Sequence, residues 1–68
     1  MEIFAKRLKE ILTQKGQNQM DFAKKLRIPH GTVNSWCLGR NYPTVEMLII
    51  ICNELHESAD YLLGLKDD

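Results

Sequence analysis

Helix-breaking residues divide this sequence into short segments, and no other feature constrains the fold as strongly. Glycine or proline stands at Gly16, Pro29, Gly39, Pro43 and Gly64, positions where a helix has to end or begin. Between them the apolar residues recur with the period of an α-helix, and strand-like alternation is absent. The sequence therefore predicts an all-α fold: a compact domain of five short helices with tight connections.

Each predicted helix has one apolar face, and several have a recognisable capping residue. Asn18, Thr44 and Ser58 are residue types that accept a hydrogen bond from the first turn of a helix. Pro29, with its preset φ angle, fits the start of the third helix. The side chains that we expect to face the core are Phe4, Leu8, Ile11, Leu12, Phe22, Ala23, Leu26, Val33, Trp36, Cys37, Val45, Leu48, Ile51, Cys52, Leu55 and Leu62.

The length of the chain excludes several classes of protein. Sixty-eight residues supply one domain, 1–68, whose thin core leaves little room for an enzyme pocket. Neither paired carboxylates nor a nucleophile–base pair is visible, so we expect no enzymatic activity. The longest apolar stretch, 47–52, is far short of the ~20 residues that span a bilayer. Two cysteines and a charged N-terminus indicate a cytoplasmic protein without a membrane segment or disulfide scaffold.

The net charge is zero, but the charges are unevenly distributed. Residues 1–40 contain eight Lys and Arg against three Asp and Glu, which gives +5, whereas residues 41–68 contain one against six, which gives −5. A chain polarised in this way can present a positive face to a polyanion. The same counts also fit solvated helix faces that happen to differ in charge and bind nothing, so charge alone leaves both interpretations open.

The segment QMDFAKKLRIPHGTVNSW, residues 19–36, carries most of the functional information. Two short helices joined by a tight turn form a helix-turn-helix unit, whose close crossing needs a small residue such as Ala23. Val33 and Trp36 anchor the second of these helices, and we interpret Trp36 as a core residue. The outward face is small or polar, which suits the reading of base edges in a major groove. Its residues are His30, Gly31, Thr32, Asn34 and Ser35.

This pattern resembles the DNA-binding domain of the lambda-repressor/Cro class, also called the XRE family. The resemblance runs from RLKEIL and KG through QMDFAKKL, Ile28, TVNSW, Gly39 and Pro43 to DYLLG, and covers about residues 3–64. It implies that the third helix enters the major groove with the outward residues as base readers, while the second helix crosses the backbone. The residues that match phosphate contacts are Asn18, Gln19, Arg40, Asn41 and Tyr42.

Four features depart from the family's pattern. Leu12 and Cys37 stand where many members have an Arg and a Glu that form a buried ion pair. Replacement of both partners of such a pair by apolar side chains can leave the stability of a protein unchanged or increase it. Arg27 replaces the usual glycine of the turn, where a left-handed backbone would cost about 1 kcal/mol. Gly31 costs a helix up to ~1 kcal/mol relative to alanine, and a close approach to DNA is a conjectured benefit. Pro29 replaces the usual capping hydroxyl and removes one phosphate contact.

The sequence thus predicts a sequence-specific regulator of double-stranded DNA, a repressor that occludes a promoter as a homodimer on a pseudo-palindromic operator. We place the dimer interface around apolar residues off the core stripe of the fourth helix, although scattered surface apolar residues are common. Its residues are Met47, Ile50, Glu54, Ala59, Tyr61 and Leu65. The alternative is an antitoxin-like or anti-repressor module that uses the same fold to hold a protein partner, which would co-purify with it.

We expect neither a cofactor nor a metal site. Cys52 and His56 have the i, i+4 spacing of two ligands on one helix. Only Cys37 and His30 remain to complete such a site, and His30 belongs to the outward face. Cys37 also lacks the neighbouring base that a nucleophile requires.

Overall fold

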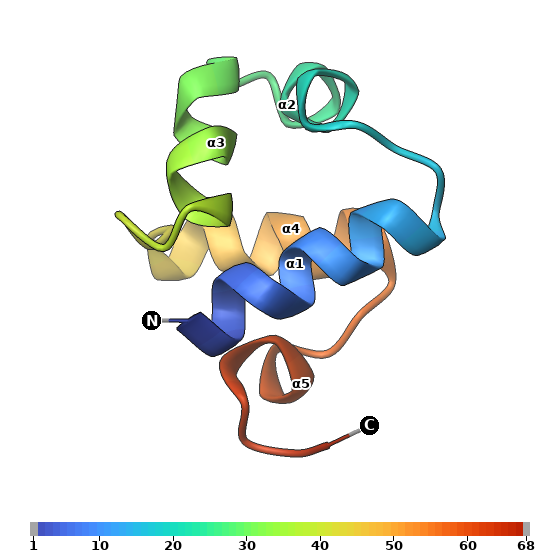
Figure 1. Cartoon of the computed structure of the whole chain (residues 1–68), viewed down its shortest axis with the longest axis vertical. Coiled ribbons are helices and arrows are strands. Elements are labelled where there is room, and N and C mark those ends of the chain that lie inside the picture. The colour runs from blue at the N-terminus through green and yellow to red at the C-terminus, as the bar shows by residue number, and fades with distance from the viewer. Residues whose placement is uncertain (1, 68) are drawn as a thin grey trace.

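The computed structural model describes residues 2–67, which form five helices and no strand. The helices are α1 (Glu2–Gln14), α2 (Gln19–Leu26), α3 (His30–Cys37), α4 (Val45–Leu55) and α5 (Ala59–Leu63). Figure 1 shows α2 and α3 at one end of the molecule and α5 at the other, with α1 and α4 crossing between them. The radius of gyration, 10.7 Å, is close to the ~11 Å expected for a folded chain of this length. The predicted five-helix architecture is confirmed.

One apolar core joins all five helices. α1 packs against α3 and α5, α2 packs against α3, and α4 packs against α5. No charged side chain is buried among residues 2–67. In the same part of the chain, no helix combines the length and the apolar character needed to cross a bilayer. The core cluster consists of Phe4, Leu8, Ile11, Leu12, Phe22, Ala23, Leu26, Val33, Trp36, Cys37, Ile51, Leu55 and Leu62.

The predicted capping residues start their helices. Through their side-chain oxygens, Asn18, Thr44 and Ser58 each accept a hydrogen bond from the N–H three residues later, at 2.8, 3.1 and 3.1 Å. Pro29 occupies the corresponding position before α3 and makes no side-chain cap. A cap contributes about 0.5–2 kcal/mol, which is substantial for a helix of eight residues such as α2.

Each helix is followed by one residue with a left-handed backbone, and the five residues are Gly16, Arg27, Gly39, His56 and Gly64. After each of them, the next N–H donates to the carbonyl oxygen five positions back, at 2.8–3.1 Å, which is the Schellman arrangement. Glycine adopts this backbone freely, whereas a residue with a side chain loses about 1–2 kcal/mol. The structure confirms that Arg27 has the left-handed backbone considered in the sequence analysis. His56 has the same conformation, which the sequence did not indicate.

Two expectations for α4 are wrong. Val45 is expected to face the core but is 75% exposed, because it lies at the first position of α4 and to one side of the line through the buried Ile51 and Leu55. Met47 is expected to lie off the core stripe but is half-buried against the core, because it lies about one helical turn before Ile51. Leu48 and Cys52, which are expected to face the core, are half-buried against it.

A single arginine fastens α5 and the residues after it to α1. The Arg7 guanidinium donates to the main-chain carbonyl oxygens of Tyr61 and Lys66, the latter at 2.7 Å. It also lies 4.3 Å from the centre of the Tyr61 ring. Both hydrogen bonds come from the same guanidinium nitrogen, Nη1, while the planar group lies over the aromatic ring, an arrangement that suits arginine better than lysine. Its pairing with Asp67, at 3.8 Å, involves a fully exposed carboxylate and adds little.

Replacement of Arg7 by alanine should lower the free energy of unfolding by about 2 kcal/mol, since two hydrogen bonds from a charged donor and one stacking contact are lost. Urea unfolding followed by circular dichroism measures this change. The matched variant Asp67→Asn removes only the exposed ion pair and should leave the unfolding midpoint unchanged. Equal losses in the two variants would show that the ion pair, and not the carbonyl contacts, fastens α5.

Candidate nucleic-acid interface

Packing fixes how α3 is held against the rest of the molecule. α3 packs against both α1 and α2, and the buried Ala23 has the small side chain that closely packed helices require. Ile28, from the turn between α2 and α3, packs against the core. Val33 is fully buried and Trp36 is only 3% exposed. The interpretation of Trp36 as a core residue is therefore confirmed, and the inner side of α3 is occupied.

The other side of α3 faces solvent and carries the predicted base readers. His30, Gly31 and Asn34 are exposed, while Thr32 and Ser35 are half-buried. None of the eight residues of α3 is Lys, Arg, Asp or Glu. Amide, hydroxyl and imidazole groups on such a surface can donate to and accept from base edges. The most accessible part of this face consists of three residues, with Thr32 and Ser35 at its margins.

The start of α2 borders a surface hollow of about 310 Å³. Asn18 and Gln19, both predicted phosphate contacts, contribute to its lining. The helix cap uses the side-chain oxygen of Asn18, so its amide N–H₂ group is the part that can donate to an outside anion. The first-turn N–H groups of α2 and the positive end of its dipole favour an anion in the same place. The remaining lining residues are Lys9, Leu12, Thr13 and Gln17.

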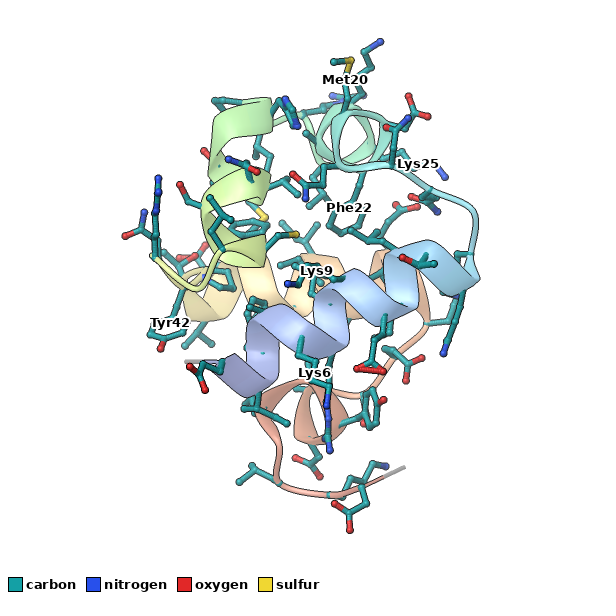
Figure 2. All side chains as sticks on the ribbon, in the orientation of Figure 1. Lys6, Lys9, Met20, Phe22, Lys25 and Tyr42 are labelled. Atoms are coloured by element: carbon teal, nitrogen blue, oxygen red, sulfur yellow. The ribbon has the colours of Figure 1, made fainter. Side chains whose placement is uncertain are left out.

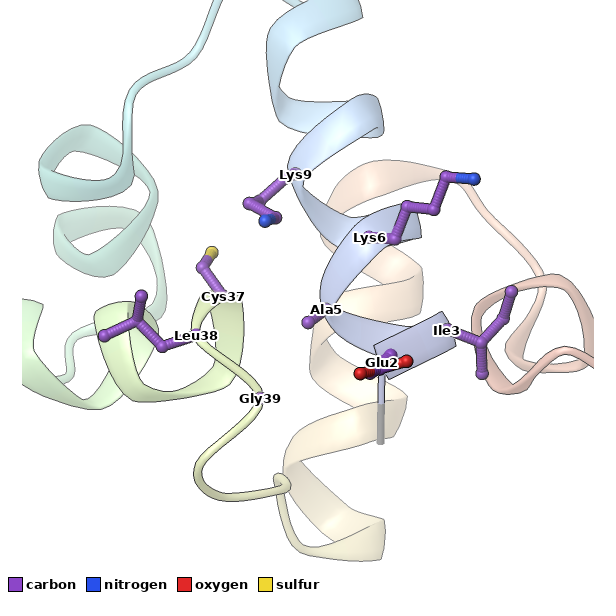
Figure 3. A pocket seen from close by; sticks show the side chains of 8 residues that line it. All are labelled: Glu2, Ile3, Ala5, Lys6, Lys9, Cys37, Leu38 and Gly39. Atoms are coloured by element: carbon purple, nitrogen blue, oxygen red, sulfur yellow. The ribbon is translucent and has the colours of Figure 1, made fainter.

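Lys9 is a cation that the sequence analysis did not assign to the site. It lines both this hollow and a larger groove of about 690 Å³ between α1 and the C-terminal end of α3. Figure 3 shows Lys9 beside Cys37 in this groove, with Lys6 nearby on α1. Lys9 is exposed, so its ammonium group is accessible to a phosphate. The only sequence signal was the basic character of residues 1–40, which does not distinguish one lysine from another.

The loop between α3 and α4 carries the other predicted phosphate contacts. Arg40, Asn41 and Tyr42 are all exposed, and they follow Gly39, whose φ of +74° turns the chain away from the end of α3. Figure 2 shows Tyr42 at the edge of the molecule, on the same side as α3. The loop thus presents one cation and several hydrogen-bond donors next to α3.

The charges are segregated by structural element. Lys6 and Lys9 on α1 and Arg40 after α3 border the surfaces just described. Figure 1 places α5 at the opposite end of the molecule from α2 and α3. The lysines of α2 and Asp60 of α5 therefore lie at opposite ends of the molecule. Arg7, in contrast, lies against α5, and Glu2 lines the groove with Lys6 and Lys9. The acidic residues of α4, α5 and the connection between these helices are Glu46, Glu54, Glu57 and Asp60.

Both cysteines are free thiols, and burial raises the pKa of each. The Lys9 ammonium partly lowers the pKa of Cys37 again, whereas the Glu57 carboxylate raises the pKa of Cys52 further. A thiol held protonated is a poor nucleophile and a poor metal ligand. Within residues 2–67, no three His, Cys, Asp or Glu residues are grouped so that they could hold a metal ion.

The residues predicted for a dimer interface lie in different environments. Ile50 is 46% and Leu65 is 73% exposed, and Glu54 is exposed as well. Ala59 is half-buried. Met47 and Tyr61 are half-buried against the chain's own core. The structure also exposes two apolar residues of α4 that the prediction omitted, Val45 and Ile49.

A comparison with models of protein families identifies the family to which this arrangement of helices belongs. The model described as helix-turn-helix matches residues 8–62, a range that contains all of α2, α3 and α4. No individual curated protein and no solved structure gives a match. The family match covers most of the chain and includes the buried underside and the exposed face of α3. The chain therefore belongs to the helix-turn-helix family of lambda-repressor/Cro-like, or XRE, DNA-binding domains.

Proposed function

We propose that this protein is a sequence-specific transcriptional repressor that occupies a pseudo-palindromic operator as a homodimer and thereby blocks a promoter. The observation that carries this proposal is the two-sided character of α3. Val33 and Trp36 are buried, while His30, Gly31 and Asn34 are exposed and belong to a helix without Asp, Glu, Lys or Arg. This supports insertion of α3 into the major groove, with the hollow at the start of α2 on a phosphate. Repression by occlusion requires only that the site is occupied.

Asn34→Ala should weaken binding to the preferred operator by roughly 1–3 kcal/mol and reduce its advantage over random duplexes, because a side chain that can contact a base through two hydrogen bonds is lost. Fluorescence anisotropy with an operator selected from random duplexes measures both affinities. Asn53→Ala is a matched control, since Asn53 is an exposed asparagine on α4, and it should bind as wild type does. Equal losses on operator and random DNA would contradict base reading by Asn34.

Lys9→Ala and Arg40→Ala should each weaken binding to the operator and to random duplexes by the same factor. Each should also reduce the magnitude of the slope of log K against log salt concentration by about 0.9, the contribution of one phosphate contact. Titrations at several salt concentrations give this slope. Lys66→Ala is the control, because Lys66 follows α5 at the opposite end of the molecule. An unchanged slope for Lys9→Ala would remove Lys9 from the interface.

Exposed apolar side chains on α4 and after α5 support the homodimer. Ile50 and Leu65 each lose contact with water only if a partner covers them, and burial of such side chains stabilises association. The half-buried Ala59 and Tyr61 belong to the neighbouring α5. Two copies related by a two-fold axis would present two α3 helices to successive major grooves, about 34 Å apart.

Ile50→Glu should convert the dimer to a monomer, because a carboxylate in an apolar contact loses its hydration without gaining a partner. Sedimentation velocity measures the change in mass, and operator affinity should fall with it. Val45→Glu places the same charge on an exposed apolar residue on another side of α4 and should leave the mass unchanged. Dissociation caused by Val45→Glu alone would move the interface to the Val45 and Ile49 side of the helix.

A further inference from the structure

The exposed face of α3 has a restricted chemistry for reading bases. In the major groove, Arg and Lys read guanine with paired hydrogen bonds, whereas Asn and Gln read adenine. α3 contains no Arg, Lys or Gln, and its one asparagine, Asn34, is exposed. Asn34 is therefore the only side chain of this helix that can make a paired contact with a single base, and that base is adenine.

Gly31 lies three positions before Asn34, so the two residues share one side of α3. Its backbone is not in the left-handed region that favours glycine. A Cβ atom built at Gly31 meets nothing within 4 Å. Neither the backbone conformation nor the packing of the chain therefore requires glycine here, although glycine destabilises a helix relative to alanine. The missing side chain leaves room for something outside the chain to come close to this face.

The short reach of the asparagine side chain links the exposure of Asn34 to the glycine at position 31. Asparagine is much shorter than arginine or lysine, so it reaches a base edge only if the helix backbone lies deep in the groove. Thr32 and Ser35, at the margins of the face, are short as well. A helix face without a Cβ at Gly31 can approach the base edges more closely than one that carries a side chain there.

We propose that α3 seats closely on the base edges over Gly31 and that each half-site contains an A·T pair whose adenine is read by Asn34. This inference rests on the proposed function and names the base pair that its reading surface selects. The arginines nearest to α3 in sequence, Arg27 and Arg40, could read guanine instead, and they lie outside α3 at its two ends. Guanine contacts from these residues would fall at the edges of a half-site.

Selection from a library of random duplexes tests the identity of the base. The wild-type chain should enrich a motif with an invariant A·T pair, and Asn34→Ala should make that pair degenerate. Asn34→Arg should change the preference at the same pair from adenine to guanine by about tenfold or more. A wild-type motif with guanine at the pair that depends on Asn34 would overturn the inference while leaving sequence-specific binding intact. Failure to enrich any sequence at low salt would instead overturn the proposed function.

Gly31→Ala tests the close approach. The variant should melt a few degrees higher than wild type, because alanine stabilises the helix, and it should bind the selected operator about tenfold or more weakly. The higher melting temperature excludes misfolding as the cause of the weaker binding. Asn53→Ala, on α4, is the control for operator affinity. A Gly31→Ala variant that binds the operator as tightly as wild type would overturn the close seating of α3.

Discussion

Burial of Val33 and Trp36 is the contact on which the rest of this molecule's function depends. α3 has eight residues, too few to be a stable helix in isolation, so tertiary packing has to hold it in place. That packing also sets its rotation, since the side occupied by Val33 and Trp36 cannot face solvent. The exposure of His30, Gly31 and Asn34 is therefore a consequence of the core. A core substitution that rotated α3 would change which residues are exposed without replacing any of them.

The ends of the helices show how far residue types alone predict the backbone. Gly16, Gly39 and Gly64 are helix-ending residues in the sequence, and all three are left-handed in the structure. Arg27 has the same backbone, and only its place in a recognised motif identified it. Nothing in the chemistry of His56 distinguishes it from a residue inside a helix. Its left-handed backbone belongs to the turn after α4, in which the Glu57 N–H donates to the Cys52 carbonyl oxygen.

α4 and α1 show two further limits of prediction from sequence. The run 47–52 is apolar without interruption, so the helical period within it is ambiguous, and this explains the wrong placement of Met47. The placement of Val45 is wrong because an apolar residue at the first position of a helix can also face solvent. The predicted base readers and the first predicted phosphate contacts follow from a motif that is local in sequence. Lys9 joins them only through the packing of α1 beside α2 and α3, which a pattern within α1 does not contain. Contacts between distant segments, such as Arg7 with Tyr61, have no sequence signal for the same reason.

A net charge of zero is compatible with DNA binding because affinity depends on the charges near the phosphates. Eight of the nine basic residues lie within residues 1–40. Apart from Arg7, which contacts α5, they lie on or near the elements of the proposed interface, and the acidic residues of α4 and α5 belong to other elements. With a Debye length of about 8 Å at physiological salt, the acidic end exerts little force on DNA bound at α2 and α3. The same acidic residues would repel the duplex if the domain approached by its opposite end. In the proposed mode of binding, this distribution of charge favours one docking orientation, and α3 then needs no cation of its own to attract the duplex.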